Sequence, residues 1–135
     1  MSVNWSEQYS VKVKELDNQH KKLFDIINKL DSNMRLGKGR EILGLVLKDM
    51  VEYTKVHFTT EERILRNTGY PDYDKHKSIH ENVTEKVSSI HKKYLEGNAL
   101  TLSIETMDYL KNWLSKHILG TDHMYIQHLN SKGVV

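Results

Sequence analysis

Four long segments of this 135-residue chain share one feature: large apolar side chains recur at alternating steps of three and four residues. That period places the side chains on one face of an α-helix, as a stripe that must pack against other helices. Glycines separate the segments, at Gly37, Gly39, Gly69 and Gly97. Glycine favours the end of a helix because it readily adopts the left-handed conformation found there. Four such helices joined by short loops predict an all-α, up-down-up-down four-helix bundle.

Helix boundaries follow from the capping residues. Asp17 is a good N-cap for the first helix, Thr101 is one for the fourth, and Gly120 is expected to interrupt the fourth. The expected helices are four long segments and one short C-terminal segment: about 17–36, 40–66, 72–96, 101–119 and 121–130.

Residues 1–16 have a different pattern. Tyr9, Val11 and Val13 alternate with polar residues, and Trp5 precedes them. Strict alternation predicts an extended N-terminal arm whose apolar side chains lie on the bundle. A short edge strand is the alternative, although the sequence offers no obvious second strand to pair with it.

Bulk properties exclude several classes of protein. The length fits one domain over residues 1–135, and the net charge of +2 is too small to argue for nucleic acid or for a membrane surface. No apolar run approaches the ~18 residues of a membrane span, and the N-terminus does not resemble a signal peptide. The chain has no cysteine, which excludes disulfides, cysteine-bound zinc and iron–sulfur clusters. We therefore expect a cytoplasmic protein.

Ionisable residues occupy positions on the apolar stripes where a bundle needs a core: His20, His57, Glu61, His76, His80 and His117. If neighbouring helices are antiparallel, all six come to the same end of the bundle. A buried polar group without a partner costs about 1–3 kcal/mol, so six together need something to bind them. A metal site resolves this conflict. Asp122 is a seventh candidate, although it follows His117 by five residues and needs a break at Gly120 to reach the site.

The number of donor atoms predicts two unequal metal ions. If both carboxylates bridge two ions that also share a solvent-derived oxygen, each ion has three oxygen donors. Five histidines then divide into three and two, which leaves one ion six-coordinate and the other five-coordinate with an open position. A donor set of nitrogen and bridging oxygen suits iron or manganese better than zinc or copper.

The spacing His20, His57-x-x-x-Glu61, His76-x-x-x-His80, His117-x-x-x-x-Asp122 resembles the signature of the hemerythrin family, in its single-domain bacterial form. The resemblance implies two iron ions bridged by an oxo or hydroxo group and by Glu61 and Asp122. It assigns three histidines to the saturated iron and two to the iron with the open position: His76, His80 and His117, then His20 and His57.

The resemblance also implies a function. The family binds dioxygen reversibly at the five-coordinate iron, as hydroperoxide, which serves O2 storage, delivery or sensing rather than enzymatic turnover. An apolar pocket that excludes water would surround the bound dioxygen. The residues that match this O2 pocket are Leu23, Phe58, Trp113, Leu114 and Ile118.

Two alternatives to O2 binding remain open, a di-iron oxidase or peroxidase and a protein that binds iron or nitric oxide. Carboxylate-rich di-iron enzymes use paired Glu-x-x-His motifs, and the sequence contains none.

Tyr125, eight residues after His117, is a candidate for approaching the site. Three further histidines fall off the ligand pattern and are expected on the surface: His91, His123 and His128. The sequence leaves any protein partner open.

Overall fold

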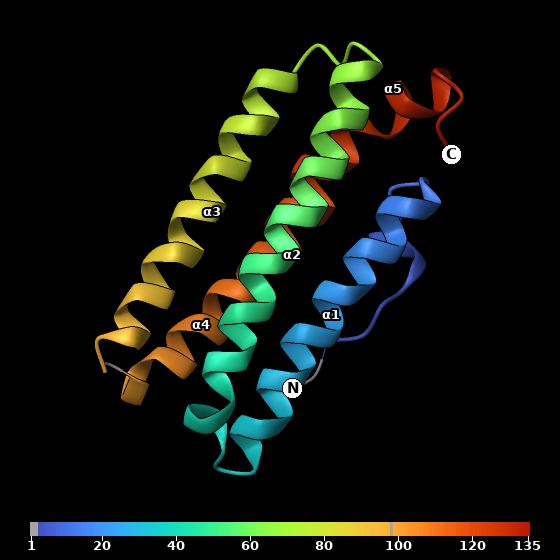
Figure 1. Ribbon diagram of the computed structural model, residues 1–135. Coiled ribbons are helices and arrows are strands. Elements are labelled where there is room, and N and C mark those ends of the chain that lie inside the picture. Colours follow the sequence, from blue (N-terminus) through green and yellow to red (C-terminus); the bar gives the residue numbers. More distant parts are fainter. Residues whose placement is uncertain (1–2, 98) are drawn as a thin grey trace.

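The computed structural model of this chain describes residues 3–97 and 99–135, without the side chains of residues 99–101. Four long helices lie side by side (Figure 1). They are α1 (Lys14–Arg35), α2 (Gly39–Asn67), α3 (Tyr73–Leu95) and α4 (Ala99–Trp113). The chain continues from α4 through a π-helix η2 (Leu114–Thr121), a 3₁₀-helix η3 (Asp122–Tyr125) and the short α5 (Ile126–Ser131). The predicted all-α four-helix bundle is confirmed.

The connecting loops alternate between the two ends of the bundle, so that neighbouring helices are antiparallel (Figure 1). Each helix packs against the next, and α4 closes the bundle against α1. Gly37, Gly69 and Gly97 have positive φ angles of 73°, 69° and 91°, the conformation expected of glycine just past a helix. The predicted cap by Thr101 lies outside the described side chains. Within the described part of the chain, no helix combines the length and apolar character needed to cross a bilayer.

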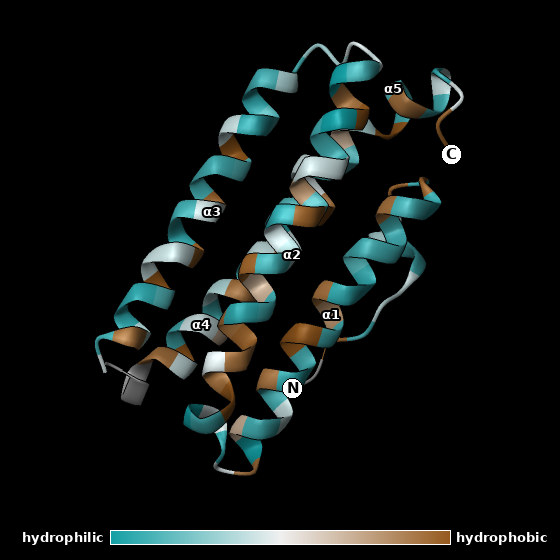
Figure 2. Ribbon diagram, in the orientation of Figure 1, coloured by the Kyte–Doolittle hydropathy of each residue, from teal (hydrophilic) through white to brown (hydrophobic). Residues whose placement is uncertain are grey.

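The apolar stripes face one another and form the core (Figure 2). Leu23, Ile27 and Leu30 of α1 are fully buried, as their spacing predicts. On α2 the sequence left Thr60 and Glu61 as alternatives for the inward position. Glu61 is the buried residue and Thr60 is half-buried. A carboxylate therefore replaces an apolar side chain in the core at this level.

Helix α1 begins earlier than its sequence predicts, and Asp17 is not its N-cap. The backbone N–H of Asp17 already donates to the carbonyl of Val13, at 2.9 Å, so the helix is under way. The Asp17 carboxylate instead accepts hydrogen bonds from the Ser10 hydroxyl, at 2.6 Å, and from the backbone N–H of Val11, at 2.8 Å. The Asp17 side chain therefore holds the N-terminal arm against the helix by hydrogen bonds and does not cap the helix.

The N-terminal arm is not extended throughout, because Glu7–Tyr9 forms a 3₁₀ turn, η1. No strand is present in the described residues. The ring of Tyr9 packs edge-on against Phe24, with centroids 4.8 Å apart. Val11 and Val13 are buried as predicted, in a second apolar cluster at the end of the bundle. That cluster joins the arm to α2 and to the C-terminal segment: Val11, Val13, Leu16, Leu65, Tyr70, Tyr125 and Leu129.

Candidate metal centre

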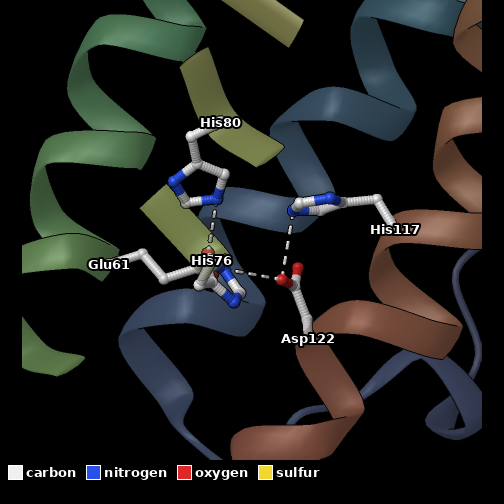
Figure 3. Close-up of side chains that lie close together, drawn as sticks. All are labelled: Glu61, His76, His80, His117 and Asp122. Atoms are coloured by element: carbon white, nitrogen blue, oxygen red, sulfur yellow. Dashed lines mark hydrogen bonds and ion pairs between the residues drawn. The ribbon is translucent and has the colours of Figure 1, made fainter. Parts of the chain in front are cut away.

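The seven predicted ligand side chains come together at one end of the bundle. They come from α1, α2, α3, η2 and η3, and they are His20, His57, Glu61, His76, His80, His117 and Asp122. Each of them is at most 3% exposed. They form two overlapping groups that share both carboxylates. We call His76, His80 and His117 the three-histidine half, and His20 and His57 the two-histidine half. Figure 3 shows the three-histidine half with the two carboxylates.

The two oxygens of Glu61 face different halves. Oε1 lies 2.6 Å from Nε2 of His76 and 3.0 Å from Nε2 of His80. Oε2 lies 3.4 Å from Nε2 of His57 and 3.7 Å from Nε2 of His20. The Glu61 carboxylate is therefore placed between the halves, as a bridging ligand must be.

Asp122 repeats this arrangement from the opposite side. Its Oδ1 lies 3.1 Å from Nε2 of His117 and 3.3 Å from Nε2 of His76. Its Oδ2 lies 3.2 Å from Nε2 of His20. Each carboxylate thus gives one oxygen to each half, and the five histidines divide into three and two.

A π-helix explains how Asp122 reaches the site. A π-helix has i to i+5 hydrogen bonds, so residues five apart share one face. Residues Leu114–Thr121 adopt this conformation, and His117 and Asp122 point into the same space. The break predicted at Gly120 is wrong, because the helix continues through that residue with a wider turn. Single π-helical turns inside α-helices occur frequently at functional sites.

Two polar side chains orient histidines by hydrogen bonds to Nδ1, the ring nitrogen that faces away from the site. Nδ1–H of His57 donates to Oε1 of Gln19, at 2.7 Å, and Nδ1–H of His80 donates to Oε2 of Glu62, at 2.8 Å. We assign the proton to Nδ1 because each partner there is an acceptor. Nε2 of each ring then presents its lone pair to the site, which is the arrangement that metal-ligating histidines use. Neither Gln19 nor Glu62 is among the site residues that the sequence predicts.

Aromatic rings hold three of the histidines by stacking. Phe58 lies parallel to His80, with centroids 3.8 Å apart and an interplanar angle of 2°. Trp113 stacks on His117 at 4.9 Å, and Tyr53 stacks on His57 at 5.2 Å. These contacts restrict the rings to the orientations that point Nε2 inward.

Tyr125 reaches the site, as its spacing from His117 suggested. It is fully buried, and its hydroxyl donates to Oε2 of Glu61, at 2.8 Å. This hydrogen bond fixes the carboxylate from the side of the C-terminal segment. Tyr125 also packs against the ring of His76, with centroids 5.6 Å apart.

The side chains of the site form a buried network of ion pairs. Burial lowers the pKa of His20 and of His76, but the carboxylates of Asp122 and Glu61 outweigh burial and raise these pKa values to about 9 and about 10. Burial raises the pKa of the Asp122 carboxyl, yet the neighbouring histidines hold it below its usual range. The carboxylates are therefore ionised, and two of the histidines carry protons that a metal ion would displace.

The residues fit a pair of metal ions. The potential ligand atoms within each group all lie within 4.8 Å of one another. Atoms that share one ion at about 2.1 Å are at most about 4.2 Å apart, so only small shifts are needed. Among the described residues, Nε2 of His80, Nε2 of His117 and both oxygens of Asp122 are buried in ion-pair contacts but make no hydrogen bond. A metal ion would satisfy all four atoms.

The other sequence predictions concern residues around the centre. All five predicted pocket residues are buried in the main core, and their role in excluding water stays a prediction: Leu23, Phe58, Trp113, Leu114 and Ile118.

Three histidines lie outside the two ligand groups: His91, His123 and His128. They are half-buried rather than on the surface, which corrects that expectation. Nε2 of His128, for example, donates to the carbonyl of Thr68, at 3.0 Å.

Residues 11–129 match the family model described as "Hemerythrin HHE cation binding domain". The chain belongs to the hemerythrin family. It is 30% identical to a bacteriohemerythrin of Clostridium acetobutylicum over 126 residues, which is 90% of this chain and 97% of that protein. It is 31% identical to a bacteriohemerythrin of Methylococcus capsulatus, over 87% of this chain and 88% of that protein. The cluster is thus the cation-binding site of a hemerythrin domain.

The bundle is also similar to a solved hemerythrin structure. The crystal structure of a wild-type hemerythrin superposes with a TM-score of 0.85 at 29% identity, and the match covers 96% of this chain and 98% of that chain. The similarity therefore extends over nearly the whole length of both hemerythrin chains.

Proposed function

We propose that this hemerythrin, as a single domain, holds two iron ions and binds dioxygen reversibly at the two-histidine half. The observation that supports this most directly is the division of the donor atoms. Each carboxylate offers one oxygen to each half, while three histidines face one half and two face the other. The two-histidine half has one protein ligand fewer, so the open position belongs there.

The assignment of ligands follows the geometry. His76, His80 and His117 would hold one iron, His20 and His57 the other, and Glu61 and Asp122 would bridge the two. When bound, a pair of ferrous ions supplies the two electrons that reversible binding of dioxygen needs. The set of donors, five imidazoles and two carboxylates, suits such ions.

This chain's own residues set the conditions for binding rather than turnover. Only two of the seven ligands, the carboxylates of Glu61 and Asp122, are negatively charged, so the donor set carries less negative charge than a carboxylate-rich enzyme site does. Leu23, Leu114 and Ile118 are at most 2% exposed and would keep water from the bound gas. We infer that the protein is not an enzyme. The biological use of the bound dioxygen would be storage, delivery or sensing.

Metal analysis and an anaerobic O2 titration test this proposal. We expect two irons per chain, one dioxygen bound for every two irons, and an absorption band that appears with O2 and disappears when O2 is removed. One zinc per chain would contradict the assignment of the metals. Steady consumption of O2 with turnover of a reductant would favour the oxidase or peroxidase alternative instead.

A pair of histidine variants adds a matched control. His20→Ala removes one of the two histidines of the half that would bind O2, and the reversible absorption band should be lost. His91→Ala changes a half-buried histidine on α3 outside the ligand groups and should leave iron content and O2 binding unchanged.

A further inference from the structure

The hydroxyl of Tyr53 is buried without a hydrogen-bond partner among the described residues. The side chain lies one helical turn before His57 on α2 and is only 7% exposed. An unpartnered buried hydroxyl costs about 1–3 kcal/mol, and a ligand that accepts a hydrogen bond from it would recover this cost. The second buried tyrosine at the site, Tyr125, has its partner in Glu61.

Tyr53 lies on the two-histidine half. Its ring stacks on His57 with an interplanar angle of 20°. The side chain therefore lies beside the half in which the number of histidines leaves a ligand position open.

A cleft between α1 and α2 leads from the surface to this tyrosine. Its volume is about 390 Å³, and its lining includes the buried residues Tyr53 and His57. Ile26 and the exposed Val56 lie along its walls. Two smaller clefts, of about 240 and 90 Å³, reach the three-histidine half beside His117 and His76. The largest of the three thus approaches the half that has fewer ligands.

The charges around this cleft bear on what could enter. Asp25, Asp49 and Glu52 line it together with one cation, Lys22. An excess of negative charge disfavours anions and leaves small neutral molecules unaffected. The cleft would therefore admit a neutral diatomic gas more readily than an anion of similar size.

We propose that Tyr53 is a specificity-determining residue whose hydroxyl donates a hydrogen bond to a small neutral ligand, a diatomic gas that reaches the two-histidine half through this cleft. This inference deepens the proposed function and rests on it. The hydroxyl selects ligands that have an acceptor atom, and binding supplies the partner that the folded chain lacks.

The Tyr53→Phe variant tests the proposal because it keeps the ring stacked on His57 and removes only the hydroxyl. In the iron-loaded protein, we expect dioxygen to dissociate roughly tenfold faster, which corresponds to a hydrogen bond of about 1.4 kcal/mol. Tyr109→Phe is the matched control. Tyr109 is half-buried on α4 and lines the cleft beside His117, so this variant should dissociate O2 at the wild-type rate.

Two further measurements separate a hydrogen bond from a structural effect. With nitric oxide as the probe, the N–O stretching frequency of the wild type should shift between H2O and D2O, and this shift should be absent in Tyr53→Phe. In the metal-free protein, Tyr53→Phe should unfold at the wild-type temperature or above it, because the lost hydroxyl has no partner there.

The route of entry has a test of its own. The Val56→Trp variant should slow O2 association by narrowing the cleft, whereas Ile79→Trp, at the other two clefts, should not.

The outcomes distinguish this inference from the proposed function. If Tyr53→Phe releases O2 at the wild-type rate and keeps the isotope shift, the role of Tyr53 is refuted while reversible O2 binding stands. A drop of several degrees in the unfolding temperature of metal-free Tyr53→Phe would also refute it, since the hydroxyl would then have a partner in the protein. If the iron-loaded wild type binds no O2, both proposals fail.

Discussion

The hydrogen bond from Tyr125 to Glu61 should stabilise both the fold and the metal site, and Tyr125→Phe removes it alone. The bond is 2.8 Å long, and both residues are completely buried. Phenylalanine keeps the ring contacts with Tyr70 and His76 and leaves no space larger than one oxygen atom. The variant therefore isolates the loss of one donor to a buried carboxylate.

The expected magnitude follows from the charge of the acceptor. Hydrogen bonds to charged groups contribute about 1.5–3 kcal/mol, compared with about 1 kcal/mol for neutral pairs. Water cannot replace the lost donor easily, because neither side chain is exposed. For a protein of this size, a loss of about 2 kcal/mol lowers the unfolding temperature by roughly 5–10 °C. Loss of a group that orients a ligand typically weakens metal binding by about 10–100-fold.

Thermal unfolding of the metal-free protein measures the first effect, and competition with a chelator measures the second. Tyr109→Phe serves as the control, because Tyr109 is half-buried and its ring lies beside the Lys86 ammonium, 5.8 Å away. The control should change stability by less than about 0.5 kcal/mol. If Tyr125→Phe behaves like the control in both assays, the hydrogen bond does not support the site and the reasoning is refuted.

Three other changes test separate parts of the structure. Glu62→Gln should weaken binding of the ion held by His80 by about 10–100-fold, measured by chelator competition, and unchanged affinity would show that the carboxylate does not orient the ring. Asp17→Ala should free the N-terminal arm and cost about 2–3 kcal/mol, with faster proteolysis before α1, and a protease-resistant arm would contradict this. In the metal-free protein, the raised pKa values of His20 and His76 stabilise the fold below about pH 6.5, and this contribution is lost as the pH rises through about 9 to 10. The unfolding temperature should therefore fall over that range, and a flat profile would argue against the ion-pair network.

The sequence predicted the bundle and the position of six ligands because both depend on helical periodicity. His20, His57 and His76 sit on stripes that also contain Leu or Val, and the period fixes which residues share a face. Antiparallel packing then brings the ligands to one end of the bundle. These inferences need only local helix geometry and short loops.

Features that depend on non-helical local geometry were not predictable in the same way. Asp122 reaches the site through a π-helical turn, and the residues of Leu114–Thr121 show no sequence pattern that signals one. Asp17 has the composition of an N-cap, but its carboxylate binds Ser10 and Val11 of the arm, a tertiary contact. Gln19 orients His57 from another helix. Such contacts follow from the packing of helices and not from spacing along one of them.

The bridging position of Asp122 has a consequence for how the protein folds. Asp122 faces His20, about 100 residues away along the chain, and closing a loop of that length costs roughly 4 kcal/mol of entropy. Contacts between residues so far apart in the sequence slow folding, because the loop must close before the contact can stabilise the fold. Metal ions that bind only the assembled site stabilise it by mass action. A molecule in which α1 and the η3 segment have not yet met lacks a bridging carboxylate, so retention of both ions would distinguish completely folded chains from partly folded ones.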